Sequence, residues 1–284
     1  GSGTSSRSSK LIHGGLRYLE TGQFSLVRKS LNERALLTKL APSLVKLKTF
    51  YLPVYKQQRL GRWQLGAGLS LYSLLGNLRR DSRFRLVPKS QWHTLGGIKK
   101  TGLRCVYQYH DAQTNDKLLT RAVARSADQL GATIQEHCRF IDAKLRDDGK
   151  ISISYLSDAT QPLNKQAAPS EASCHLIINA GGPWVTHIQE NIGFAANGPT
   201  VSLVQGSHIE LDQPLNDGIF YVESPIDQRP VFIMPWPTGA LVGTTEHAHS
   251  GAPESCQASD TEINYLKQTL SHYFPDYQGP VSYT

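Results

Sequence analysis

Five short apolar runs with a period of two follow one another toward the end of the chain, and they constrain its fold most. Residues that alternate in this way point to opposite faces of a strand, and turns rich in Pro, Asp, Gly and Asn separate the runs. Short turns between such runs favour antiparallel neighbours. We therefore expect an antiparallel sheet built from strands at 201–205, 208–211, 219–222, 231–234 and 240–243, followed by a capped helix at 260–273 and a strand that begins at Val281.

The first 199 residues mix helical and strand patterns. Apolar residues at Val27, Leu31 and Ala35 recur every four positions and predict a helix over 26–40 that Pro42 ends. A second helix is expected over 117–130, with Asn115 or Asp116 as its N-cap and Gly131 after its end. The remaining expectations are a short strand at 132–135, a hairpin formed by 140–146 and 150–155, a polar loop over 157–173 and a buried strand at 174–180.

Positive charge gathers between residues 46 and 89, where ten Lys and Arg residues stand against Asp81 alone. Inside this region the uncharged run 63–78 is too short to span a bilayer. Two interpretations stay open: a helix in the headgroup plane with its apolar side toward lipid, or a buried helix with solvated arginines at its ends. The apolar face of this expected helix carries Leu65, Leu69, Tyr72, Leu75 and Leu78.

Composition narrows the choice of partners. The formal net charge of +7 over 284 residues favours an anionic partner, such as an acidic substrate or a lipid surface. The sequence contains no nucleic-acid-binding motif, so we do not expect nucleic acid as a partner. The four cysteines are far apart and form no C-x-x-C, which argues against a metal site or a disulfide framework and favours a reducing compartment.

The stretch 3–20 concentrates groups that could bind a ligand. It holds several hydroxyl side chains, a histidine, cations and the pair Gly14-Gly15, which lets the main chain approach a bound group with no Cβ in the way. Arg17 could hold a phosphate or carboxylate in a fork, with Lys10 as an added point charge. On composition alone, a solvated Ser-rich terminus that caps a helix is an equal interpretation.

The run T-S-S-R-S-S-K-L-I-H-G-G-L-R-Y-L-E at 4–20 resembles the signature of the flavin-dependent glycerol-3-phosphate dehydrogenases. N-A-G-G-P-W at 179–184, G-S-H-I at 206–209, and P-W at 235–236 with G-T-T-E at 243–246 also resemble this family, in its order. The resemblance implies an α/β fold: a Rossmann-like FAD-binding domain of the glutathione-reductase and D-amino-acid-oxidase type, with an antiparallel substrate domain. It divides the chain into flavin-binding segments at 1–45 and 101–199, a basic and apolar helical insertion with membrane contact at 46–100, and the substrate domain at 200–284.

Two departures from the family pattern matter. No G-x-G-x-x-G occurs in the chain, although that fingerprint holds the pyrophosphate in this family. The chain therefore resembles the middle of the enzyme, and we expect it to hold FAD weakly and to be inactive alone. In addition, Lys117 and Leu118 stand where the family usually has Ala and Arg, which weakens any role carried over to Asp116.

The resemblance also implies roles for particular residues. His208 and His13 are the candidates for catalysis, since a histidine can act as a base near neutral pH, although each could instead only bond flavin or backbone. Arg17 and Tyr18 are the candidates for substrate binding, and Thr244, Thr245 and Glu246 lie near the site without an assigned role. The implied FAD contacts are Thr4, Ser5, Ser6, Ser9, Lys10, Leu11, His13, Gly14, Gly15, Ala180 and Gly181.

The reaction implied by the resemblance is oxidation of sn-glycerol 3-phosphate to dihydroxyacetone phosphate, with hydride transfer to flavin N5 and electrons passed to a quinone. The implied partners are glycerol 3-phosphate, a quinone, an anionic membrane surface and a second copy in a homodimer. The implied location is cytoplasmic, on the inner face of the membrane. Two alternatives stay open: another FAD-dependent oxidoreductase acting on a small acid or amino acid, and a non-catalytic module that binds a membrane or partner.

Overall fold

The computed structural model describes residues 3–157, 168–194, 198, 201–215, 218–237 and 239–283. The chain divides into two compact units. One comprises residues 1–6, 120–203 and 248–255, and the other comprises 7–119, 204–247 and 256–284. We call them the smaller unit and the larger unit. The boundaries expected at 45 and 100 do not separate these units, because residues 7–119 form one continuous part of the larger unit.

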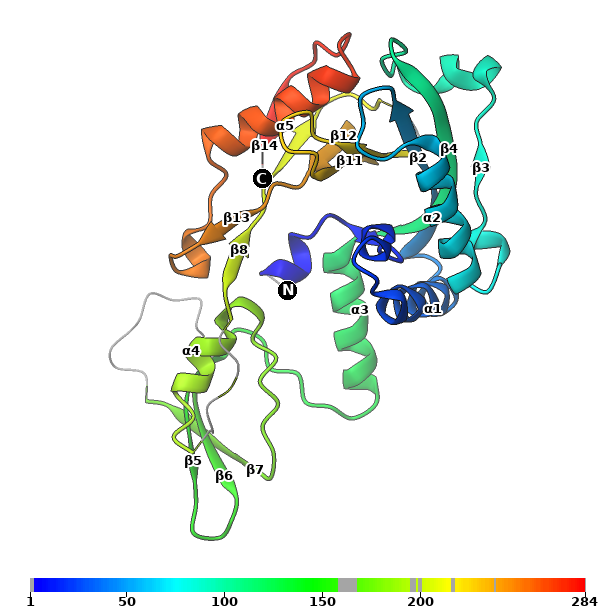
Figure 1. The fold of residues 1–284 in the computed structure, drawn as a ribbon. Coiled ribbons are helices and arrows are strands. Elements are labelled where there is room, and N and C mark those ends of the chain that lie inside the picture. The colour runs from blue at the N-terminus through cyan, green and yellow to red at the C-terminus, as the bar shows by residue number, and fades with distance from the viewer. Residues whose placement is uncertain are drawn as a thin grey trace. The chain divides into compact units, whose positions relative to one another are not determined.

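A nine-stranded sheet forms the centre of the larger unit (Figure 1). The strand order is β1-β4-β2-β10-β11-β12-β9-β14, and β3 also pairs with β4. Neighbouring strands are antiparallel except for β2 and β10, which run parallel. The strands are β1 (Leu11–Ile12), β2 (Val45–Tyr55), β3 (Arg85–Leu86), β4 (Leu103–Thr114), β9 (His208–Leu211), β10 (Ile219–Glu223), β11 (Pro230–Trp236), β12 (Gly239–Gly243) and β14 (Val281–Tyr283).

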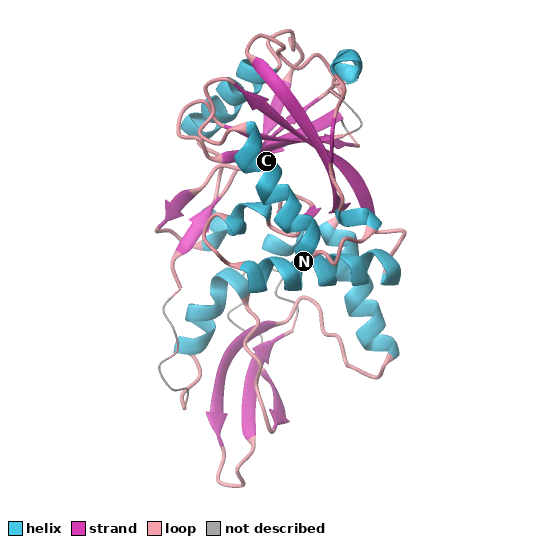
Figure 2. Cartoon of the chain, turned by 45° about the vertical axis from the view of Figure 1, so that its right-hand side comes forward, coloured by secondary structure: helices cyan, strands magenta, loops and turns pink. Residues whose placement is uncertain are grey.

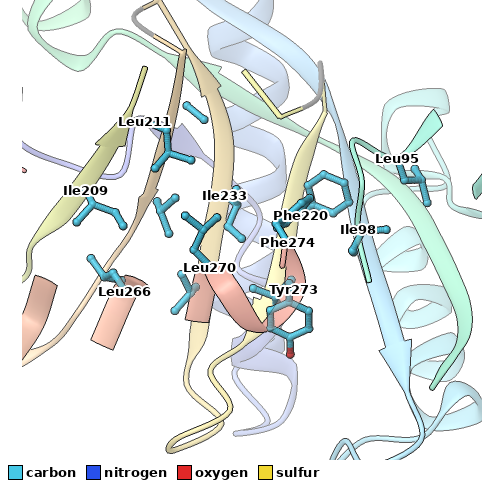
Figure 3. Packing of buried hydrophobic residues seen from close by; sticks show 14 of the residues in the cluster. Leu95, Ile98, Ile209, Leu211, Phe220, Ile233, Leu266, Leu270, Tyr273 and Phe274 are labelled. Carbon is cyan, nitrogen blue, oxygen red and sulfur yellow. The ribbon is translucent and has the colours of Figure 1, made fainter. Parts of the chain in front are cut away.

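Helices cover both faces of this sheet because the strands alternate apolar residues on both sides. Phe220 and Ile233 point to one face, where they pack with Leu266, Leu270 and other residues of α5 (Asp260–Tyr273) (Figure 3). Their neighbours Ile219 and Met234 belong to the opposite core, beneath α1 (Phe24–Leu40) and α2 (Arg62–Leu75). We call this second side the α1/α2 face, and it is the face that carries the candidate site.

Four of the five predicted strands are confirmed in this sheet as β9, β10, β11 and β12, but the strand predicted at 201–205 is not part of it. The sheet also extends beyond the predicted strands. Strands β2 and β4 pair along their whole length and join the sheet through the parallel contact of β2 with β10. The expected insertion at 46–100 is therefore wrong over 46–55, which is a sheet strand. The charges of Lys46 and Lys48 concealed this strand in the sequence. Both residues lie near its start, before the buried stretch that begins at Phe50.

Helix α2 buries the apolar face that the sequence offered to lipid. Leu69 and Tyr72 are 1% exposed, and Leu65 and Leu75 pack against the same core. The buried-helix interpretation therefore describes this face, whereas Trp63 on the other side of the helix is 79% exposed. In the part of the chain that the structure describes, no helix combines the length and hydrophobicity needed to cross a membrane.

The smaller unit contains a three-stranded antiparallel sheet, whose strands run side by side in the order β5-β6-β7 (Figure 2). The predicted hairpin is confirmed as β5 and β6, whereas residues 132–136 form no strand. Of the predicted loop over 157–173, residues 158–167 lie outside the described residues, and its end enters β7. The elements are β5 (Arg139–Leu145), β6 (Ile151–Leu156), β7 (Ser170–Cys174) and α4 (Val185–Glu190), with α3 (Asp116–Gln129) continuing into this unit from the larger one.

The buried strand expected at 174–180 is wrong. Strand β7 ends at Cys174, and Leu176 and Ile178 are 73% and 82% exposed. No described strand pairs with this run, so its apolar side chains lack the neighbours that would bury them. A separate two-stranded sheet is formed by β8 (Leu203–Gln205) and β13 (His247–His249). Short 3₁₀ helices lie at Thr4–Ser6, Leu16–Leu19, Arg80–Ser82, Lys89–Thr94, Gly182–Trp184 and Pro253–Ser255.

Candidate active site

A pocket of about 210 Å³ lies in the larger unit, between the loop 9–18 and the α1/α2 face of the sheet. Strands β4, β10 and β11 supply its aromatic walls, because their alternation places Tyr109, Tyr221 and Phe232 on this face. Seven of the residues that the sequence singled out line it, namely Ser9, His13, Gly15, Arg17, Tyr18, Thr244 and Glu246. The structure adds Leu16, Tyr109, Asp111, Tyr221, Pro230 and Phe232.

Arg17 supplies an available positive charge at this pocket. Its guanidinium lies 5.6 Å from the centre of the Tyr18 ring, and among the described residues no carboxylate lies within ion-pair distance of it. The acid Glu246 also lines the pocket, but Arg229 lies 3.3 Å from its carboxylate. An anionic ligand would therefore meet an unshared guanidinium, the group best suited to hold a phosphate or carboxylate.

His13 is the titratable ring that opens into the pocket. His13 is exposed at the pocket, and the centre of its ring lies 6.1 Å from that of Phe232. Burial lowers the pKa of His13, the charge of Asp111 opposes this effect, and Arg17 adds to it. The imidazole is therefore neutral near pH 7, the form that can accept a proton from a ligand hydroxyl.

His208 does not line the pocket. It is 6% exposed, and its Nε2 lies 3.1 Å from the Ser9 hydroxyl, with which it shares a hydrogen bond. Burial, together with the nearby Lys10 charge, lowers the pKa of His208 to about 4, so the ring is neutral at physiological pH. The structure thus places His208 behind Ser9, where it holds the loop, and gives no direct contact with the pocket for the catalytic role expected of it.

Lys10 is engaged by the protein itself. Its Nζ lies 2.9 Å from the Asp116 carboxylate, which also accepts hydrogen bonds from the backbone N–H and hydroxyl of Ser8. Although burial raises the pKa of Asp116, these bonds bring it below its usual value. The expected point charge for a ligand is therefore corrected: Lys10 fastens the loop to the first residue of α3. The cap of that helix is Asn115, whose Oδ1 accepts from Leu118 N–H.

The sequence suggested that Gly14 lets the main chain approach a ligand, but in the structure it allows close packing within the protein. A Cβ at this position would lie 2.3 Å from the Tyr72 hydroxyl and 2.5 Å from Leu31, so the close approach is to the protein's own core. The Gly14 N–H donates to Tyr72 Oη at 2.9 Å and to Asp111 Oδ1 at 3.2 Å. Gly15 lines the pocket and has a φ of 73°, a left-handed conformation that favours glycine.

Asp111, Arg34 and Tyr72 form a buried cluster that the sequence reasoning did not identify. Arg34 Nη1 donates to Asp111 at 2.6 Å, and the Tyr72 hydroxyl donates to the other oxygen of Asp111 at 2.7 Å. The Arg34 side chain has no exposed surface. A signal was present, because Asp111 continues the inward-facing series of Cys105, Tyr107 and Tyr109 on β4. A buried carboxylate in such a series requires a partner.

Five of the implied FAD contacts belong to the smaller unit and are described separately. Thr4, Ser5 and Ser6 form a 3₁₀ turn, and the preceding Gly3 lies against the Trp184 ring, since a Cβ there would be 2.9 Å from it. Ala180 and Gly181 lie in the turn before Trp184, where Asn179 Oδ1 accepts from Gly181 N–H. A Cβ on Gly181 would lie 2.3 Å from Ile188. The N-terminal turn and the Gly-Gly turn therefore share one unit, and local packing accounts for Gly181.

The fold and the pocket define a mixed α/β protein with a small-molecule site on one face of its sheet. Comparison with models of known families matches residues 1–284 to a single family, described as FAD dependent oxidoreductase and abbreviated DAO. The chain belongs to this family. The predictions of the mixed fold class and of FAD as the family's cofactor are therefore confirmed.

Curated relatives extend beyond this chain. A glycerol-3-phosphate dehydrogenase from Synechocystis is 34% identical over 287 residues, covering 96% of this chain and 51% of the relative. A D-erythritol 1-phosphate dehydrogenase from Brucella abortus is also 34% identical, over 286 residues that cover 96% of this chain and 53% of the relative. The chain thus spans about half the length of these relatives.

Among solved structures, the glycerol-3-phosphate dehydrogenase from Bacillus halodurans complexed with FAD superposes with a TM-score of 0.74. The match covers 99% of this chain and 50% of that one. At 20% identity this likeness shows the fold alone. It agrees with the predicted fold class, and it again covers half of the longer protein.

The donor set of the pocket fits the ring end of FAD. Its lining combines polar groups of Ser9, His13 and Thr244 with aromatic rings, a combination that suits a flat heteroaromatic group with a polar edge. Sites that enclose drug-sized ligands occupy about 300–1,000 Å³, so the observed 210 Å³ suits a small substrate rather than a whole dinucleotide. The residues that would border the flavin ring are therefore Ser9, His13 and Thr244, whereas Gly14 and Lys10 are occupied by other contacts.

Proposed function

We propose that the protein containing this chain oxidises sn-glycerol 3-phosphate to dihydroxyacetone phosphate, and that this chain supplies the substrate pocket. The observation that carries the proposal is Arg17, a guanidinium without an ion-pair partner among the described residues, at the wall of a pocket of small-substrate size. The names of the relatives support a phosphorylated polyol as substrate, since two of them act on such compounds by name.

Each residue of the pocket has a separate role in the proposed oxidation. Arg17 binds the phosphate dianion, and the aromatic walls exclude water from the carbon skeleton. His13, neutral at pH 7, accepts the proton of the C2 hydroxyl. A bound flavin supplies the hydride acceptor at its N5. His208 keeps Ser9 in place through their shared hydrogen bond.

We also propose a quinone as the electron acceptor and an anionic membrane surface on the cytoplasmic side as the place of action. Support comes from the family resemblance, from the net charge of +7, and from Trp63, which is 79% exposed with the Arg62 guanidinium 4.7 Å from its ring centre. Tryptophan and arginine side by side suit the boundary between headgroups and acyl chains. A homodimer stays a prediction.

The experiment that tests the substrate is a panel assayed by dye reduction with the intact protein. We expect turnover with sn-glycerol 3-phosphate and none with unphosphorylated glycerol, because only the former engages Arg17. A flavin-loaded protein that reduces the dye with neither glycerol 3-phosphate nor another polyol phosphate would contradict the proposal. A flavin-free protein that binds liposomes would instead favour the non-catalytic alternative.

The second candidate substrate is D-erythritol 1-phosphate, favoured by the equal identity to the Brucella abortus relative. It presents the same phosphate to Arg17 and has a carbon chain longer by one CHOH unit. Including both compounds in the panel decides between them, by the ratio of their kcat/KM values. A small acid or amino acid is the remaining alternative, and turnover of such a substrate that survives Arg17→Ala would favour it.

A further inference from the structure

We propose that Arg34, Asp111 and Tyr72 form a positioning cluster for the pocket, which fixes the backbone at Gly14 and thereby orients His13 and Arg17. The sequence placed Asp111 in the polar run 107–116, whose side chains could reach a pocket, but it gave Arg34 and Tyr72 no role in the site. The inference rests on the proposed function only in its kinetic test. Its structural content concerns contacts within the larger unit and stands independently of the substrate.

The cluster joins three separate elements through one guanidinium. Arg34 on α1 donates through Nη1 to Asp111 on β4 and to the His110 carbonyl at 2.8 Å, and through Nη2 to the Asp81 carboxylate at 2.7 Å. Its side chain is fully buried, and Asp111 is 1% exposed. Two carboxylates thus compensate one buried cation, whose planar fork can serve both at once.

The cluster also forms hydrogen bonds with the backbone of the loop. Asp111 accepts from Arg34 and Gly14 N–H at one oxygen and from the Tyr72 hydroxyl at the other. Tyr72 in turn accepts from the same Gly14 N–H. Gly14 therefore lies between two groups that the cluster holds still, and it is the residue that follows His13. Its missing Cβ is what lets the backbone come this close.

A structural ion pair alone does not account for this arrangement. Replacing a buried ion pair with apolar residues of similar volume is often neutral or stabilising, so stability gives no reason to bury these charges. Asp111 also accepts a hydrogen bond from a backbone N–H beside a pocket-lining ring. This third contact gives a reason to bury the charges. Asp111 also reaches the pocket wall itself, so the cluster and the site share a surface.

The test compares two variants of the cluster with a matched control in the intact protein. Tyr72→Phe removes the hydroxyl between Gly14 and Asp111, and Asp111→Asn keeps the size of the side chain but removes its charge. The control is Tyr273→Phe, which deletes a buried hydroxyl of the other core, where it donates to the Glu223 carbonyl at 2.6 Å. Both Tyr→Phe variants are expected to fold, because each loses only one hydroxyl group.

The readout is hydrogen exchange of a peptide covering residues 11–19. Because each cluster variant weakens a buried hydrogen bond to the loop, we expect roughly tenfold faster exchange in both cluster variants and wild-type exchange in Tyr273→Phe. Unchanged exchange in Tyr72→Phe and Asp111→Asn would overturn the inference. Equal acceleration in all three variants would also overturn it, because it would reduce the cluster to general stability.

The kinetic arm separates this inference from the proposed function. If glycerol 3-phosphate is the substrate, kcat/KM should fall about tenfold in Tyr72→Phe and remain near wild type in Tyr273→Phe. Unaltered kcat/KM in Tyr72→Phe, with a loosened loop, would contradict the link to the site. A protein that never turns over this substrate but shows the predicted exchange pattern would refute the function and leave the cluster in place.

Discussion

At the scale of single residues, the structure distinguishes charges used by the fold from those left for a ligand. Lys10 and Arg17 belong to the same loop, and both looked like ligand groups in the sequence. Lys10 pairs with Asp116 at 2.9 Å, whereas Arg17 lies at the pocket wall without such a partner among the described residues. Sequence alone could not separate them, because the partner of Lys10 is 106 residues away.

Arg17→Ala should raise KM for a phosphorylated substrate. The loss of one charge-assisted contact is worth about 1.5–3 kcal/mol, which corresponds to a roughly 10–150-fold rise, with a smaller effect on kcat. Steady-state kinetics with sn-glycerol 3-phosphate measure it. Arg28→Ala, which removes an equal charge from the exposed side of α1, should leave KM unchanged. An equal rise in both variants would mean that net charge, and not a contact, controls affinity.

His208 should make the protein sensitive to acid. The folded-state pKa of about 4 lies below the ordinary 6.5, so the unfolded chain binds the proton first and stability falls as pH drops through this window. The loss attributable to this ring between pH 7 and pH 4 is on the order of 3 kcal/mol. His208→Gln should remove it, so that the difference in unfolding free energy between wild type and variant shrinks as pH falls. A pH-independent difference would contradict the assignment.

At the scale of elements, regular periodicity was predictive and interrupted periodicity was not. The helix at 260–273 and strands at 208–211 and 240–243 lie close to where their patterns placed them. Strand β2 was missed because lysines at its start concealed the alternation. The run 174–180 was predicted as a strand from its apolar character alone, without a pairing partner to confirm it.

The pocket residues were likewise predictable only where a sequence pattern identified them. The loop residues His13 and Arg17 were found through a motif, and they do line the pocket. Tyr221 and Phe232 were only members of predicted strands, because which face of a strand meets the loop is a tertiary property. Asp111 was hidden more deeply, since its burial depends on Arg34 from a helix 77 residues away.

Helix α2 offers a paired test of packing at this scale. Gly68 has nothing within 4 Å of an added Cβ, so Gly68→Ala should stabilise the protein by about 0.5–1 kcal/mol through helix propensity. At Gly66 the added Cβ would lie 2.8 Å from the Tyr107 hydroxyl, which donates to the Arg62 carbonyl at 2.7 Å. Gly66→Ala should therefore be at least about 1 kcal/mol less stable than Gly68→Ala in chemical denaturation. Equal stabilisation by both substitutions would refute the packing described for α2.

At the scale of the whole molecule, the chain consists of two compact units. The sequence predicted a flavin-binding part made of 1–45 and 101–199 and a substrate part at 200–284, and these bounds differ from those of the two compact units. The larger unit instead draws on three separate stretches, which its sheet joins through β2 and β10. A single sequence carries little information on such long-range parallel pairing.

Phe220→Ala tests whether the two units unfold separately. Phe220 is fully buried in the α5 side of the sheet, so the substitution should cost about 3–5 kcal/mol. Hydrogen exchange should accelerate in peptides from β9 to β12 and remain unchanged in β5 and β6. Phe24→Ala, at a side chain that is 47% exposed, serves as the control and should cost little. Equal acceleration in β5 and β6 would show that the chain unfolds as one cooperative unit.

If this chain forms the phosphate-recognising pocket of a flavin oxidoreductase, an anaerobic titration of the intact, FAD-loaded protein should reveal it. Adding sn-glycerol 3-phosphate should bleach the absorbance of oxidised flavin, while glycerol should not. In Arg17→Ala the same bleaching should require a substrate concentration about 10–150-fold higher. Bleaching by glycerol and by its phosphate at the same concentration, unaffected by Arg17→Ala, would mean that the pocket does not recognise the phosphate.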